Sequence, residues 1–232
     1  MFGCLVVDTR RRNTSSPSSL WQRPPSSLLP LLLQTDVHTS YLIFAPPPLR
    51  YEQGRNYFFD FGSTSFAYEG RKDSLARQLQ RFKKYSHVDF DDIFCWEAKI
   101  NTRPSNYWAE VPPHLIPKMH FYNVPIQSDL DSAMSAVRII QQVATKRDYV
   151  VVKLDIDNNP VETAIMDQVL HSAHLLSLID ELFWEHHVKG SPSQWHHWGD
   201  LAHLKGDYAN LTSSYKAFLA LRQAGIRAHS WV

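Results

Sequence analysis

The stretch that decides the fold is "DYVVVKLDIDNNPVE", residues 148–162. Its first residues predict a buried strand, which ends in Lys153, Asp155 and Asp157, and Glu162 follows five residues later. Because side chains alternate between the two faces of a strand, Lys153, Asp155 and Asp157 are expected to share one face. Burying an unpaired charge costs far more than one apolar side chain gains. The acidic end of this strand therefore needs a role other than packing.

Segments of the same kind lie on both sides of this stretch and alternate with helical patterns. The helical segments carry apolar residues three and four positions apart, and the strand segments are short apolar runs. Such alternation predicts an α/β, Rossmann-like fold, with a mostly parallel, doubly wound sheet covered by helices on both faces. We predict strands at 56–63, 92–98, 118–126, 148–157, 178–188 and 226–232, and helices at 73–85, 129–144, 160–176 and about 211–225.

The length, composition and net charge of the chain limit which domain organisation and which partners are expected. The chain has 232 residues, 44% of them hydrophobic, and we expect one domain over residues 51–232. Residues 1–50 are rich in Ser, Pro and Leu and predict a disordered or targeting segment, so the compartment stays open between cytoplasm, organelle and secretory lumen. A net charge of +1 gives no indication of nucleic-acid binding, no stretch is long enough for a transmembrane segment, and the oligomeric state is undetermined.

Acidic residues recur where the predicted strands end. Asp60 ends the first strand, Glu97 the second, Asp155 and Asp157 the fourth, and Glu185 the fifth. The carboxyl ends of parallel strands meet at one edge of the sheet, and ligands of open α/β sheets bind there. Any one of these residues could instead cap a helix or face solvent, but five acidic residues at four strand ends together predict a shared crevice.

The first two strand ends indicate the kind of ligand. Gly62 follows the first strand and allows a ligand to approach the backbone closely. A carboxylate at Glu97 can accept hydrogen bonds from both hydroxyls of a ribose. The glycine spacings of dinucleotide-binding and phosphate-binding loops are absent from the sequence. A nucleoside without phosphates, such as S-adenosylmethionine, suits this pattern.

Five segments in this order resemble the FkbM-type S-adenosylmethionine-dependent methyltransferases, in a eukaryotic branch of that group. They are "FFDFGSTSF", "IFCWEAK", "FYNVPIQSD", "VVKLDIDNNPVE" and "LFWEHHV", and the resemblance covers residues 56–188. It implies S-adenosylmethionine as the cofactor and methylation of a hydroxyl oxygen on a small-molecule or glycan acceptor. It also assigns cofactor binding to Asp60, Gly62, Ser63, Glu97, Asp155 and Glu162.

Within that set the resemblance implies distinct positions. Asp60 and Gly62 would line the methionine side of the cofactor, Glu97 would hold the ribose, and Asp155 would lie beside the transferred methyl group. An oxygen acceptor must also lose a proton, for which a positioned base is needed. The candidates are Asp155, His186 and His187, and strand alternation turns one of the two histidines towards the crevice.

Two alternatives remain open. Phe66 stands where the family has a second glycine, which favours a catalytically inactive binding or scaffold module of the same fold. Residues 185–203 hold five of the twelve histidines, which raises a metal-dependent enzyme as a third reading. The histidine spacing matches no metal motif, so no metal ligands are predicted.

Overall fold

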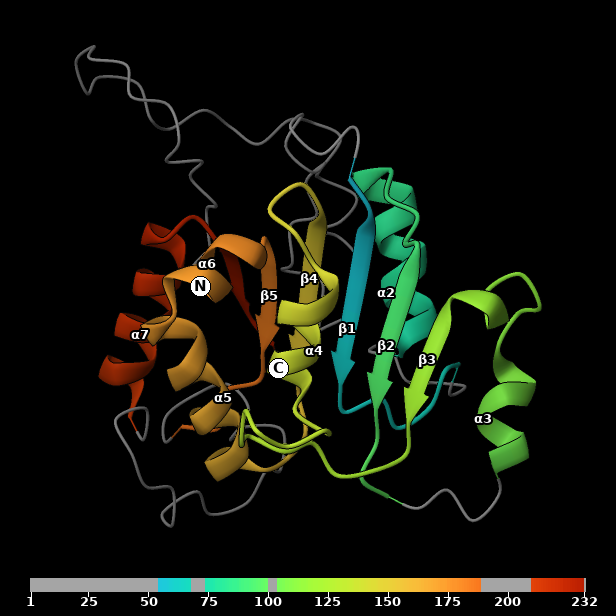
Figure 1. The fold of residues 1–232 in the computed structure, drawn as a ribbon, viewed down its shortest axis with the longest axis horizontal. Coiled ribbons are helices and arrows are strands. Elements are labelled where there is room, and N and C mark those ends of the chain that lie inside the picture. Colours follow the sequence, from blue (N-terminus) through green and yellow to red (C-terminus); the bar gives the residue numbers. More distant parts are fainter. Residues whose placement is uncertain (1–53, 68–73, 100–103, 189–209, 232) are drawn as a thin grey trace.

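The sheet has the doubly wound arrangement that the sequence predicts. The computed structural model describes residues 54–67, 74–99, 104–188 and 210–231. All six strands in these residues are parallel, in the order β3-β2-β1-β4-β5-β6 (Figure 1). The chain starts in the centre, winds outward to β3, and returns to build the other half. The strand order therefore reverses between β1 and β4, which is where open α/β sheets bind ligands.

The strands and helices have defined bounds in the structure. The strands are β1 (Asn56–Phe61), β2 (Asp92–Trp96), β3 (Met119–Tyr122), β4 (Tyr149–Leu154), β5 (Glu181–Trp184) and β6 (Arg227–Ser230). The α-helices are α2 (Leu75–Arg81), α3 (Pro104–Glu110), α4 (Ala136–Val143), α5 (Asn159–His171), α6 (Ala173–Leu178) and α7 (Leu211–Gln223). Two further helical turns are the π-helix η3 (Phe82–Ser86) and the 3-10 helix η4 (Ile116–Lys118).

Each predicted strand is confirmed, with narrower bounds, and two predicted helices need correction. The helix expected from 129 begins only at Ala136, because the Ser135 side chain caps it by accepting from the Arg138 backbone N–H. The helix expected over 160–176 is two helices, since Ser172 ends α5 and caps α6. The predicted segment 1–50 lies outside the described residues.

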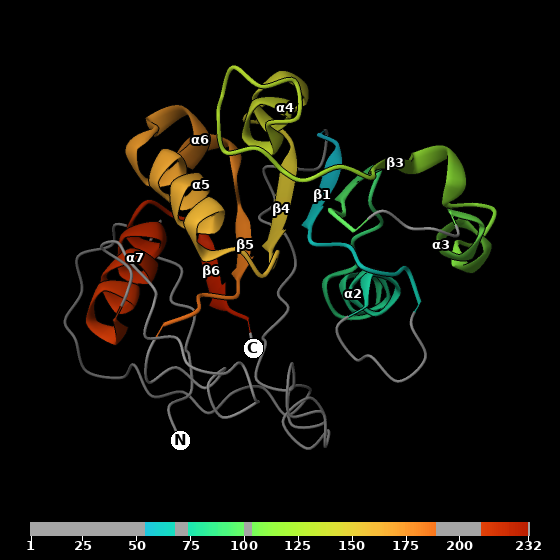
Figure 2. The ribbon, with the colours of Figure 1, turned by 90° about the horizontal axis from the view of Figure 1, so that it is seen from below.

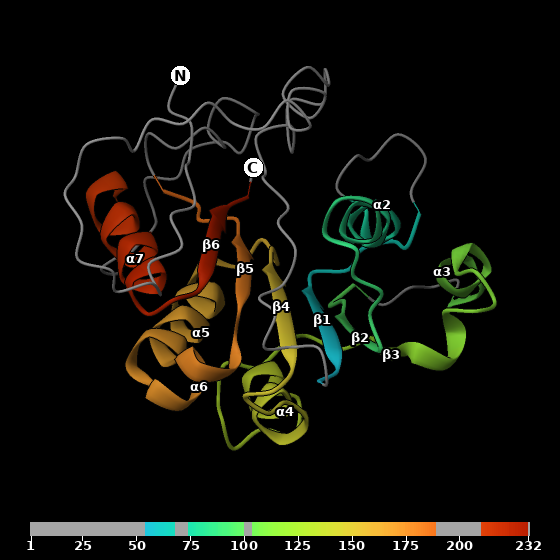
Figure 3. The ribbon, with the colours of Figure 1, turned by 90° about the horizontal axis from the view of Figure 1, so that it is seen from above.

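Two apolar cores form because the central strands are buried on both faces. Helices α4, α5 and α6 cover one face, and α7 packs on the same side near β6, while α2 lies on the opposite face (Figures 2 and 3). The larger core includes Phe59, Leu154 and Trp184, and the core on the α2 side includes Phe58 and Phe82. This packing holds the carboxyl ends of the strands at one edge.

The membrane prediction concerns helix length. Among the described helices, none has the length and apolar content that crossing a bilayer requires.

Candidate functional site

A cavity lies at the carboxyl edge of the sheet, where the strand order reverses. Its volume is about 170 Å³. It is lined by Gly62, Thr64, Trp96, Glu97, Ala98, Lys99, Pro125, Ile126, Asp155, Ile156, Asp157, Asn158 and Val161. The walls combine apolar side chains with carboxylates from the ends of β2 and β4. A cavity is thus present at the predicted edge, and three of the five acidic strand-end residues, Glu97, Asp155 and Asp157, line it together with Gly62. Asp60 and Glu185 do not line it, so the predicted crevice is confirmed only in part.

Lys153 explains why the end of β4 tolerates carboxylates. Its ammonium nitrogen lies 3.1 Å from Asp60 Oδ1 and 3.0 Å from Asp155 Oδ2, and it is buried. Burial alone lowers the pKa of Lys153 and raises that of Asp155. The mutual attraction outweighs burial at both groups, so the pKa of Lys153 is raised and that of Asp155 is lowered. Asp60 is buried in this ion pair and is not among the residues that line the cavity.

Gly62 is required by the protein backbone itself. Its φ is +103°, and a Cβ atom there would lie 1.6 Å from the Asp155 carbonyl oxygen. The loop after β4 therefore makes the close approach to the Gly62 backbone that the sequence predicted for a ligand. The contact joins the ends of β1 and β4, and Gly62 still lines the cavity beside them.

Glu97 is positioned by the loops after β2 and β3. Its Oε1 atom accepts a hydrogen bond of 2.7 Å from the Lys99 backbone N–H. Asn123, at the end of β3, donates to the carbonyl oxygens of Glu97 and Lys99 at 2.8 and 2.7 Å. The Asn123 amide thereby fixes the turn that presents the Glu97 carboxylate to the cavity.

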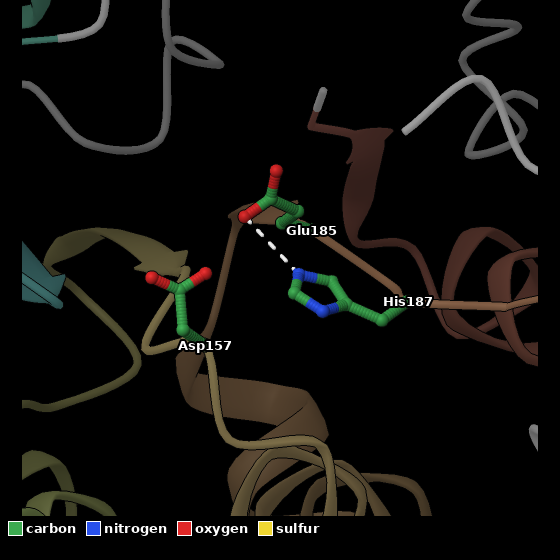
Figure 4. A group of neighbouring side chains, drawn as sticks. All are labelled: Asp157, Glu185 and His187. Carbon is green, nitrogen blue, oxygen red and sulfur yellow. Dashed lines mark ion pairs between the residues drawn. The ribbon is translucent and has the colours of Figure 1, made fainter. Parts of the chain in front are cut away.

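A second group of polar side chains lies where β4 and β5 end. Asp157, Glu185 and His187 converge there, and His187 Nε2 lies 3.3 Å from Glu185 Oε2 (Figure 4). Asp157 has φ +55°, so strand alternation ends before it and does not determine where its side chain points. Burial and the charge of Asp155 raise the pKa of Glu185 to about 11. Burial also lowers the pKa of His187, which favours its neutral ring.

Glu162 supports this edge from inside the fold. It is fully buried in the first turn of α5, and it accepts hydrogen bonds from the Ile156 N–H at 3.0 Å and from Trp184 Nε1 at 3.2 Å. Burial raises its pKa to about 8, although both donors favour the ionised form. Glu162 therefore ties the loop after β4 to the end of β5 without lining the cavity.

Two of the predicted site residues, Ser63 and His186, lie away from the cavity. Ser63 is buried and shares a 2.8 Å hydrogen bond with the Tyr107 hydroxyl. His186 is buried, stacks on Trp184 with ring centroids 3.9 Å apart, and bonds Ser214 Oγ at 2.9 Å. Neither Ser63 nor His186 lines the cavity in the described structure, whereas His187 lies beside Asp157, which does.

The sequence did not single out two residues that shape the site. Lys153 was placed on the face of Asp155, but its role as counter-ion to two carboxylates was missed, although alternation indicates it. Trp231 donates from Nε1 to Asp155 Oδ2 at 3.0 Å from beyond β6, a contact without a local signal. Phe66 packs in the core on the α2 side and does not plug the cavity.

Comparison with known proteins assigns no family. No protein-family model, curated protein or solved structure matches the chain. The class that fold and site define is a Rossmann-like α/β protein with an acidic crevice at the strand reversal, and the resemblance to FkbM-type methyltransferases stays a prediction.

Proposed function

We propose that the chain binds S-adenosylmethionine in this cavity and transfers its methyl group to a hydroxyl oxygen of a small molecule or glycan. The observation that carries the proposal is the presence of Gly62, Glu97 and Asp155 in the lining of one cavity at the strand reversal. A carboxylate at the end of the second strand is the usual partner of a ribose diol in folds of this order.

The lining residues divide into a polar and an apolar part that suit a nucleoside. Glu97 offers carboxylate oxygens to the ribose, and Trp96, Ile126 and Ile156 offer apolar surface to a base. S-adenosylmethionine supplies an activated methyl group, so the protein needs chiefly to position the two reactants and to exclude water.

Proton removal from the acceptor falls to a residue near the mouth of the cavity. The lowered pKa of His187 leaves its ring neutral and able to accept a proton. Asp155 is a weaker base, because its ion pair with Lys153 and the hydrogen bond from Trp231 stabilise the ionised form. His187 is thus the favoured base of the three candidates.

One observation favours the second candidate function, a non-catalytic binding module. The cavity of about 170 Å³ is smaller than ligand pockets of roughly 300–1,000 Å³. A pocket this small accommodates only part of S-adenosylmethionine, and a smaller nucleoside fits it more readily.

Calorimetric titration of the full chain with S-adenosylmethionine tests the proposal. We expect saturable binding that weakens about tenfold or more in Glu97→Gln, because a hydrogen bond to a charged group is lost. The glutamine carbonyl can keep the contact with the Lys99 N–H, so the fold is preserved. Asp167→Asn, at an exposed position on α5, is the matched control and leaves the affinity unchanged. Lack of binding by a folded sample leaves the binding-module function in its place.

A further inference from the structure

Three potential metal ligands meet between the ends of two neighbouring strands. Asp157 follows β4, and Glu185 and His187 follow β5, with one possible ligand atom from each lying within 4.8 Å of the other two (Figure 4). Glu185 and His187 are buried, whereas Asp157 is exposed at the edge. The group is therefore held from inside and open on one side.

The spacing of the two buried members suits a metal ion. Two ligands bound at about 2.1 Å to a tetrahedral ion lie about 3.4 Å apart. His187 Nε2 and Glu185 Oε2 lie 3.3 Å apart. Asp157 must approach further to complete the set, and rotation about its side-chain bonds at an exposed position allows this.

The carboxyl groups around Asp157, Glu185 and His187 also favour a cation. Five carboxyl groups gather at this edge of the sheet: Asp60, Asp155, Asp157, Glu162 and Glu185. Lys153 makes its ion pairs with Asp60 and Asp155. Among the described residues, the ion pair of Glu185 is with His187, and its buried Oε2 atom has no hydrogen-bond partner. A buried carboxyl oxygen beside an imidazole nitrogen is thus left for a cation to satisfy.

We propose that Asp157, Glu185 and His187 bind a divalent transition-metal ion, Mn²⁺ or Zn²⁺. The imidazole selects against Mg²⁺ and Ca²⁺, and two carboxylates suit Mn²⁺ and Zn²⁺. Asp157 also lines the cavity, so an ion held by these three residues would lie at its edge, within reach of an oxygen ligand of a second substrate. This inference revises the expectation of no metal ligands.

The metal site and the methyl-donor site are separable. Glu97 and the apolar wall belong to the proposed nucleoside site, whereas the three metal ligands lie between β4 and β5. A ligated His187 is not available as a base, and a bound cation then lowers the pKa of the acceptor hydroxyl instead. Binding of metal and binding of S-adenosylmethionine are measured separately, so either can fail alone.

The test is a titration of the full chain with metal alone. After treatment with a chelator and dialysis, the protein is titrated calorimetrically with MnCl₂ and with ZnCl₂, and bound Mn²⁺ is followed by electron paramagnetic resonance. We expect one saturable site whose affinity falls at least about tenfold in Asp157→Asn, in Glu185→Gln and in His187→Gln. The double variant Asp167→Asn, His171→Gln removes an exposed pair of the same residue types on α5 and leaves the affinity unchanged.

Three outcomes overturn the proposal. One is the absence of saturable Mn²⁺ and Zn²⁺ binding by the folded wild-type chain. Another is unchanged affinity in Asp157→Asn, an exposed position that decides the matter if Glu185→Gln fails to fold. The third is binding of Mg²⁺ or Ca²⁺ that is as tight as that of Mn²⁺ and indifferent to His187→Gln, because the imidazole is then no ligand.

Discussion

Buried glutamates at the two ends of the sheet have pKa shifts in opposite directions. At the amino end, Glu181 is fully buried and bonded to Arg227 at 2.7 Å, to His229 at 2.9 Å and to the Tyr149 hydroxyl. Burial raises the pKa of Glu181, but these partners outweigh it and lower the pKa overall. At the carboxyl end, the pKa of Glu185 is raised to about 11 by burial and by neighbouring carboxylates.

Acids at the strand starts also have a structural partner each. Asp91 accepts from the Asn56 N–H at 2.8 Å, Asp148 from the Arg55 N–H at 2.8 Å, and Asp180 from the Val150 N–H at 3.0 Å. These carboxylates satisfy backbone donors where strands begin. The contrast teaches that a buried carboxylate with matched partners stabilises the fold, whereas carboxyl groups that outnumber their counter-ions indicate a candidate ligand site.

The largest expected effect separates the two ends directly. Glu181→Gln removes the charge that pairs with Arg227 and His229, and we expect a loss of about 3 kcal/mol of unfolding free energy. The raised pKa of Glu185 favours a protonated carboxyl in the metal-free fold near neutral pH, so we expect no loss from Glu185→Gln. Urea denaturation of both variants at pH 7.5 with a chelator measures the difference. Equal destabilisation of the two variants would break the comparison.

The next effect concerns the buried cation of the carboxyl end. Lys153→Met leaves the buried Asp60 and the half-buried Asp155 without their partner, and we expect a loss of about 3 kcal/mol at neutral pH. In the wild type the lowered pKa of Asp155 contributes stability above its unfolded pKa, and this contribution is lost as pH falls through the folded pKa.

The loss of stability caused by Lys153→Met is expected to become smaller as the pH falls. Without the lysine, the Asp155 carboxylate takes up a proton more readily, so acidification from pH 7.5 to 5 is expected to recover part of the loss. Denaturation at both pH values measures this, with Lys146→Met at an exposed position as control. A loss that does not change with pH would show that packing of the lysine stem, not charge, stabilises the site.

The third expected effect concerns how stability changes with pH, and it comes from Glu162. Its pKa of about 8 in the fold lies above the ordinary value of 4.5, so the folded state keeps a proton that the unfolded state releases. Its contribution to stability therefore falls as pH rises from about 4.5 to 8, with a slope of at most about 1.4 kcal/mol per pH unit. Glu162→Gln removes that part of the slope, which denaturation across this range detects. An unchanged slope contradicts the raised pKa.

The smallest effect lies at the amino end. Asp91→Ala leaves the Asn56 N–H without its acceptor at the start of β1, and we expect a loss of about 1 kcal/mol. Asp167→Ala, on the exposed surface of α5, is the control and changes stability by less. Thermal denaturation of the two variants measures the difference, and equal midpoints would show that water replaces this contact.

Local sequence patterns determined most of the fold. Apolar runs and helical spacing placed every described strand of the sheet, because burial on both faces demands such runs. The same patterns put carboxylates at the ends of four strands and so predicted the edge at which they meet. Two helix boundaries were misplaced, because capping by Ser135 and Ser172 ended patterns that periodicity alone would have extended.

Only the tertiary structure decided what those carboxylates do. Lys153 neutralises Asp60 across neighbouring strands, Trp231 reaches Asp155 from beyond β6, and the left-handed backbone at Asp157 brings it towards Glu185 and His187. Each depends on distances between residues far apart along the chain. Electrostatic energy depends on those distances and on burial. Spacing along the sequence therefore placed the charged residues at the strand ends, but it did not show which of them would have a partner of opposite charge.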